Sequence, residues 1–118
     1  MLSNEKQYDE TLKYVNEAIK IDSTYDLYFQ QQGQILFLKN NLKNALKAFN
    51  TAIFINEKKP ELYDERAEVY EKLADYYQRA IKNLTTSIEI YNKDGNIYYR
   101  RGMLYLKIKN VNQGLKNR

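Results

Sequence analysis

The chain has 118 residues, of which 43% are hydrophobic and 29% charged, and its formal net charge is +4 at pH 7. It contains neither cysteine nor histidine, which excludes disulfides, thiolate or imidazole metal sites, cysteine nucleophiles and Ser-His-Asp triads. One proline and four glycines are too few for the many tight turns of a sandwich or barrel, so the composition favours helices.

Apolar residues recur at helical spacing along nearly the whole chain. The sequence predicts short breaks at Asn40-Asn41, Leu73-Ala74-Asp75 and Lys109-Asn110, which have the length that joins antiparallel helices. The sequence therefore predicts an all-α chain of antiparallel helix pairs, with about six helices and the start of a seventh from Val111. The six helices are expected at about 5–21, 25–38, 42–56, 60–73, 76–91 and 95–108.

The apolar pattern repeats along the chain with a first step of 34 residues and a second step of 35. Gly33, Ala67 and Gly102 form a column of small residues, which suits a close approach between paired helices. A fixed period of this length is typical of helical repeat arrays. The other columns are Phe29, Tyr63 and Tyr98; Leu36, Tyr70 and Tyr105; Leu12, Leu46 and Ile81; Val15, Phe49 and Leu84; Ala18, Ala52 and Ser87; Ile19, Ile53 and Ile88; and Ile21, Ile55 and Ile90.

With these columns the sequence resembles the tetratricopeptide repeat family, whose pattern is W-x2-L-G-x2-Y, then A-x3-F and a junction proline. In one unit Phe29, Gly33 and Leu36 match the first half of the pattern, and Ala45 and Phe49 match the second half. The resemblance implies a right-handed superhelical array of antiparallel helix pairs, an α-solenoid.

Two columns depart from the family pattern. The leucine column reads Gln32, Arg66 and Arg101, and the junction proline is replaced by Ser23, Glu57 and Lys93. Long polar side chains can lay their stems on apolar surface, so the fold is retained. We expect looser packing between successive units.

The repeats predict a single domain over 1–118 with an incomplete unit at each end. Residues 5–24 form the second half of a repeat, 25–59 and 60–94 are complete repeats, and 95–118 hold a first helix and the start of a second. Solenoids usually need three or more repeats to bury their faces. We therefore expect a fragment of a longer array, whose end faces are covered by flanking repeats or by end-to-end self-association.

The resemblance implies a protein-interaction module or assembly scaffold that holds a partner segment in a concave groove formed by the first helices of the pairs. Residues 61–75 carry six acidic and two basic side chains, which indicates either a groove for a protein or peptide partner with basic residues or a solvated helix face that is acidic near its N-terminus. The groove residues, transferred from the family's concave positions, are Gln30, Gln34, Phe37, Glu61, Asp64, Glu68, Glu71, Asn96, Tyr99, Arg100 and Met103.

Two other roles stay open. The chain could be a structural subunit whose end faces, rather than its groove, contact its neighbours. It could also be a co-chaperone that holds acidic C-terminal peptides in the family's carboxylate clamp. The clamp is disfavoured, because only Arg100 keeps its residue type and Glu65 would repel a carboxylate. The clamp positions read Gln30, Gln34, Glu65, Asn96 and Arg100.

Several function classes find no support in the residues. Carboxylates in an open groove do not make a catalytic or metal site, so we predict no enzyme, no cofactor and no metal. Nucleic acid is not an expected partner, because the basic residues form no continuous stripe. No apolar run approaches the roughly 20 residues of a membrane span, and we expect an intracellular, cytoplasmic protein.

Overall fold

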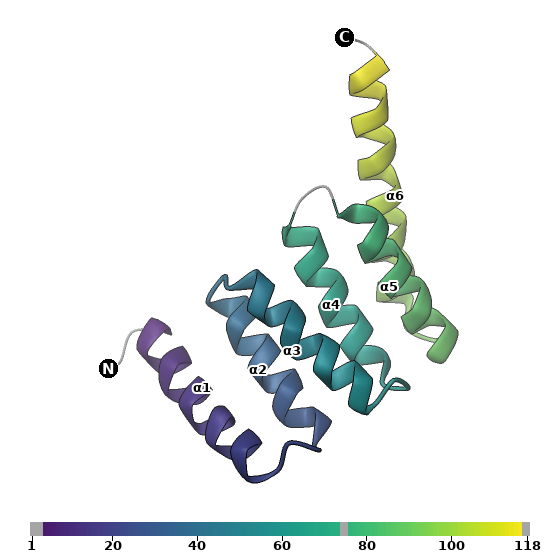
Figure 1. The fold of residues 1–118 in the computed structure, drawn as a ribbon. Helices are drawn as coiled ribbons and strands as arrows, with labels where there is room; N and C mark the ends of the chain where they lie inside the picture. The colour runs from purple at the N-terminus through teal and green to yellow at the C-terminus, as the bar shows by residue number, and fades with distance from the viewer. Residues whose placement is uncertain (1–3, 74–75, 117–118) are drawn as a thin grey trace.

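The computed structural model describes residues 4–73 and 76–116, which contain six α-helices and no strand. Each helix packs against the next in chain order, and α2 also contacts α4, so the molecule is an elongated row of 53 × 33 × 23 Å (Figure 1). Across these residues no helix is both long enough and apolar enough to cross a membrane. The helices are α1 (Asn4–Ile21), α2 (Asp26–Leu38), α3 (Leu42–Ile55), α4 (Pro60–Lys72), α5 (Tyr77–Ile90) and α6 (Gly95–Lys116).

The first five predicted helices are confirmed, and each of their ends lies within one residue of its predicted position. Local chemistry explains two of the starts. Pro60 opens α4, where its missing N–H would have no intrahelical partner. Asn41 precedes α3, and its side-chain oxygen accepts a hydrogen bond of 3.4 Å from the backbone N–H of Asn44. Ala74 and Asp75, in the second predicted turn, lie outside the described residues.

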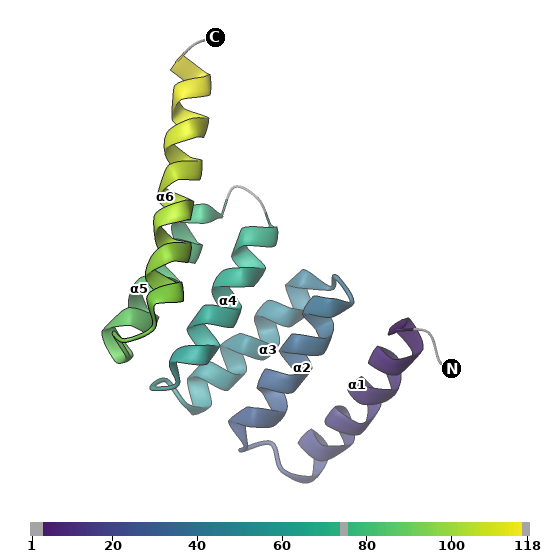
Figure 2. The same ribbon diagram turned by 180° about the vertical axis from the view of Figure 1, so that it is seen from behind.

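The predicted break at Lys109 and Asn110 is wrong, and so is the start of a new helix at Val111. α6 runs without interruption over 22 residues, and its last turns stand clear of α4 and α5 in Figures 1 and 2. In the turn between α2 and α3, by contrast, Asn40 adopts the left-handed region with φ 62°, which asparagine tolerates better than most residues. The repeat steps place Lys109 in the column of Asn40, and lysine favours a continuing helix.

One hydrophobic core lies between α2, α3 and α4. A methyl group at Gly33 would come within 2.8 Å of the Phe49 ring, so the glycine permits this helix pair to approach closely. Phe49 is 1% exposed as a result. The predicted close approach is therefore confirmed for this pair. The buried residues of the cluster are Leu36, Ala45, Ala48, Phe49 and Val69.

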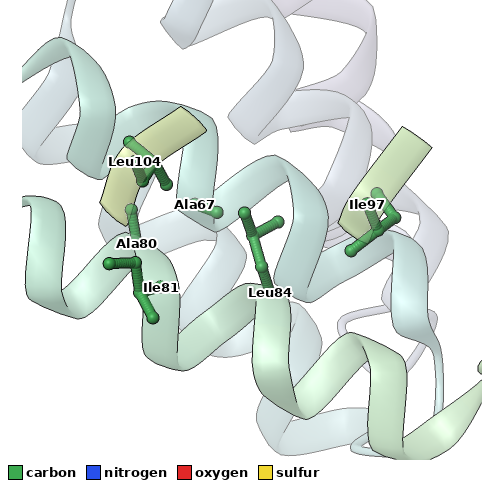
Figure 3. Packing of buried hydrophobic residues seen from close by; sticks show 6 residues of the cluster. All are labelled: Ala67, Ala80, Ile81, Leu84, Ile97 and Leu104. Atoms are coloured by element: carbon green, nitrogen blue, oxygen red, sulfur yellow. The ribbon is translucent and has the colours of Figure 1, made fainter. Parts of the chain in front are cut away.

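A second core lies between α4, α5 and α6 (Figure 3). α4 contributes to both cores, because Val69 belongs to the first and Ala67 to the second, and both are fully buried. The row is therefore held together through the shared helix. The buried residues of the second cluster are Ala67, Ala80, Ile81, Leu84, Ile97 and Leu104.

The polar residues that replace the family's leucine form a ladder of hydrogen bonds to the preceding helix. Their partners form a repeat column of their own, since Asn50 follows Asn16 by 34 residues and Thr85 follows Asn50 by 35. The column that departs from the family pattern thus joins each first helix to the unit before it. The bonds run from Gln32 to Asn16 at 2.9 Å, from Arg66 to Asn50 at 3.0 Å and from Arg101 to Thr85 at 3.2 Å.

Candidate partner-binding groove

Two adjoining pockets form a groove along α2, α4 and α6, the three helices turned toward the viewer in Figure 2. The α2–α4 pocket has a volume of about 330 Å³, and the α4–α6 pocket has about 360 Å³. Phe37 and Glu68 line both pockets, so the two are continuous. The α2–α4 pocket is completed by Gln34, Leu38, Phe49 and Glu65, and the α4–α6 pocket by Glu71, Lys72, Arg100 and Lys107.

Glu65 is the centre of a polar network in the α2–α4 pocket. The side-chain amides of Gln30 and Gln34 donate to its carboxylate at 3.1 Å and 2.7 Å. Lys59 in turn donates to the Gln30 side-chain oxygen at 2.7 Å and to Asp26 at 3.3 Å. Burial raises the pKa of Glu65 above its ordinary value, and the hydrogen bonds from Gln34 and Gln30 oppose that rise. Gln30 and Gln34 therefore hold Glu65 in place through their amide groups.

The acidic residues nearer α6 face a cation from that helix. Arg100 donates to the Glu71 carboxylate at 3.5 Å and to the backbone oxygen of Asp64 at 3.4 Å. Burial raises the pKa of Asp64, while the nearby Ser87 hydroxyl and the charge of Arg100 act in the opposite direction. The Oδ1 atom of Asp64 has no hydrogen-bond partner among the described residues. Over 4–73 and 76–116, no three carboxylates gather closely enough to hold a metal ion.

Glu68 and Phe37 form the open part of the groove. Glu68 is exposed, and in the part of the chain that the structure describes it makes no hydrogen bond or ion pair. Phe37 is half-buried, and the ammonium nitrogen of Lys72 lies 5.9 Å from the centre of its ring. Leu38, which is 54% exposed, extends the apolar wall. An apolar wall beside an unpaired carboxylate suits a side chain with an aliphatic stem and a positive end.

The structure brings together some of the predicted groove residues and separates others. Gln34, Phe37, Glu68, Glu71 and Arg100 line the two pockets. The remaining exposed members of the predicted set, which line neither pocket, are Glu61, Asn96, Tyr99 and Met103.

Five lining residues are absent from the predicted set, and one of them, Glu65, was considered only as a position of the carboxylate clamp. Lys72 follows Glu68 by four residues and Lys107 follows Arg100 by seven, so both occupy concave positions of their helices, although neither belongs to the predicted set. Leu38 directly follows Phe37. Phe49 gave no such signal, because it belongs to α3 and matches a core column.

Comparisons with known proteins agree with this architecture, although no protein-family model matches the chain. Over 58 residues the chain is 31% identical to the TPR repeat-containing protein MJ1428 of Methanocaldococcus jannaschii, a match that spans 49% of this chain and 10% of that protein.

Two solved structures show the same arrangement of helices. The Sgt2 TPR domain from Aspergillus fumigatus superposes with a TM-score of 0.83 at 16% identity, covering 94% of this chain and 74% of that one. The first TPR of Spaghetti (RPAP3), bound to the HSP90 peptide SRMEEVD, superposes with a TM-score of 0.82 at 14% identity, covering 89% of this chain and 82% of that one. The resemblance to the tetratricopeptide repeat family is therefore confirmed, and the chain has the fold of that family.

Proposed function

We propose that this chain is a protein-interaction module and that its groove holds a partner segment bearing a basic side chain next to an apolar one. The observation that carries the proposal is the α2–α4 pocket, in which Phe37 and Leu38 form an apolar wall beside Glu68. The Spaghetti domain, which shares the fold, binds a peptide, and this supports a peptide-binding role here.

Charge favours a basic segment over an acidic one at this pocket. Glu65 and Glu68 both line it, and the charge of Glu68 contributes to the raised pKa of Glu65. A positive side chain from a partner would relieve this like-charge repulsion, whereas a carboxylate would add to it. The proposed partner chemistry therefore differs from that of a carboxylate clamp.

A peptide array and one charge reversal test the proposal. The array should return segments in which Lys or Arg lies beside an apolar residue, and Glu68→Lys should weaken their binding to the whole chain by about tenfold or more. Glu61→Lys is the matched control, because it makes the same charge change on the same helix outside both pockets. An array that returns only acidic segments, or equal losses from the two variants, would contradict the proposal.

The role of structural subunit is a second candidate, and α6 supports it. Tyr98 and Tyr105 are 42% and 53% exposed, although their column equivalents Tyr63 and Leu36 are buried. If this face contacts a neighbour, Tyr105→Glu should abolish assembly while Glu68→Lys leaves it intact. The reverse result would favour the groove, and size-exclusion chromatography with light scattering distinguishes the two.

A further inference from the structure

A basic pocket lies on the side of α4 opposite the groove, between α3, α4 and α5. This α3–α5 pocket has a volume of about 400 Å³. None of the described residues that line it is acidic. Its polar lining consists of Arg66, Arg79 and Lys82 together with Asn50, Asn83 and Thr86.

Arg66 is a half-buried cation whose hydrogen-bond partners are uncharged. Its Nε donates to Asn83 Oδ1 at 2.7 Å and its Nη1 to Asn50 Oδ1 at 3.0 Å. The Asn83 amide is itself fixed, because it donates to the backbone oxygen of Arg79 at 2.7 Å. Burial lowers the pKa of Arg66. The guanidinium is thus held in a defined position, and within 4–73 and 76–116 its hydrogen bonds reach no negatively charged group.

Two further cations border the same pocket. The guanidinium carbon of Arg79 lies 5.0 Å from the ring centre of Tyr76 and 5.9 Å from that of Tyr70, which restricts its position. Lys82 follows Arg79 by three residues and therefore lies on the same face of α5. Like charges at this spacing are unfavourable, and an anion bound between them would reverse that effect.

The repeat supplies an internal comparison. A pocket of about 330 Å³ between α1, α2 and α3 is lined by residues in the same columns. This α1–α3 pocket holds one cation, Lys47, where the α3–α5 pocket holds three. The equivalent residues are Gln32 for Arg66, Asn44 for Arg79, Lys47 for Lys82, Asn16 for Asn50, Ala48 for Asn83 and Thr51 for Thr86.

We propose that the α3–α5 pocket binds a phosphate group, either free or as a monoester, with Arg66, Arg79 and Lys82 as its ligands. Guanidinium and ammonium groups are the side chains that proteins use for phosphate, and a dianion matches three cations better than a single carboxylate does. The site is independent of the groove, because Arg66 is directed toward α3 and α5 whereas Glu65 faces α2.

An NMR titration of the whole 15N-labelled chain tests this site. Inorganic phosphate and O-phosphoserine are added in separate experiments, with acetate at matched ionic strength as the singly charged reference. We expect saturable shifts at the α3–α5 pocket and weaker ones with acetate. Tighter binding of phosphoserine would identify a monoester as the ligand, and tighter binding of inorganic phosphate would identify the free ion. The proposal is overturned if the shifts do not saturate or if acetate causes shifts as large as those caused by phosphate. It is also overturned if phosphate shifts the α1–α3 pocket as much as the α3–α5 pocket.

Variants taken from the α1–α3 pocket sharpen the test. The double variant Arg66→Gln with Arg79→Asn places in the α3–α5 pocket the neutral residues that the α1–α3 pocket has at the same repeat positions. Phosphate binding should then weaken by about tenfold or more. Lys47→Gln is the control and should leave the affinity unchanged. The converse variant, Gln32→Arg with Asn44→Arg, should create a second binding site. If circular dichroism shows that the first double variant does not fold, the converse variant becomes the test. The absence of a second binding site in that variant overturns the proposal.

Discussion

Gly33 and Gly102 occupy the same repeat column and have opposite environments. A methyl group on Gly33 would meet the Phe49 ring, whereas one on Gly102 would meet nothing within 4 Å. The neighbouring column differs in the same way, since Leu36 is 8% exposed and Tyr105 is 53% exposed. Within the described residues, α2 is followed by a returning helix and α6 is not. The burial and the contacts of a repeat residue therefore depend on whether a returning helix packs against the helix that carries it.

The largest expected effect is the loss of the Phe49 ring. Phe49→Ala would leave a cavity against Gly33, and the free energy of unfolding should fall by about 3–5 kcal/mol. Tyr105→Ala, on the open face of α6, should change it by less than about 0.5 kcal/mol. Urea denaturation of both variants measures the contrast, and equal losses would show that the face of α6 is covered in solution.

The two glycines should respond to alanine with opposite signs. Gly33→Ala forces the Phe49 ring to shift, and overpacking of this kind destabilises by about 1–3 kcal/mol, partly offset by alanine's better helix propensity. Gly102→Ala meets no obstacle, so the unfolding free energy should rise by as much as about 1 kcal/mol. The two thermal midpoints measure the contrast. A stabilised Gly33→Ala variant would show that α2 and α3 pack less closely than described.

A smaller effect is expected at the turn that gives α2 its partner. Asn40→Lys places the residue type of Lys109 at φ 62° and should destabilise the chain by about 1 kcal/mol. Lys109→Asn lies within α6, where asparagine has a slightly lower helix propensity, and should change stability by less than about 0.5 kcal/mol. Chemical denaturation of the pair compares the two positions. Equal effects would mean that the left-handed residue does not explain why one helix turns and the other continues.

The smallest expected effect separates the covered Glu65 from the open Glu68. Because the pKa of Glu65 is raised on folding, the folded state binds this proton more tightly than the unfolded state does. The corresponding stability is present below its ordinary pKa of 4.5 and is lost as the pH rises through the folded-state value. Glu65→Gln should therefore gain stability relative to the unmodified chain as the pH rises, and Glu68→Gln, which removes only one of the causes of the raised Glu65 pKa, should gain less. Urea midpoints measured across acidic and neutral pH test this, and parallel pH profiles for the two variants would contradict it.

The sequence predicts the described fold almost completely, with one error that has a physical cause. Two steps of fixed length identify the helix pairs, since one hydrophobic column after another recurs in register. The repeat steps do not predict that α6 continues past Lys109 and Asn110. Its turn was inferred by analogy with the turn at Asn40, but the substituted residue, Lys109, lacks asparagine's tolerance for the left-handed region.

The groove was only partly accessible to sequence reasoning. Column positions indicate which helix face a residue occupies, and two members of the predicted set, Phe37 and Glu68, line the same pocket. They do not reveal contacts between helices, such as the bonds that Gln30 and Gln34 donate to Glu65. Those bonds depend on side-chain lengths and on the distance between α2 and α4.

α4 supplies Val69 to one core and Ala67 to the other, two residues apart and both without exposed surface. In a linear array each unit is stabilised only by its neighbours. Two neighbouring cores can therefore unfold together only because of the elements that they share. Here that element is a single helix of 13 residues. We therefore expect a defect in α1 or α6 to loosen one end of the molecule while the other end stays folded, and a defect in α4 to uncouple the unfolding of the two halves.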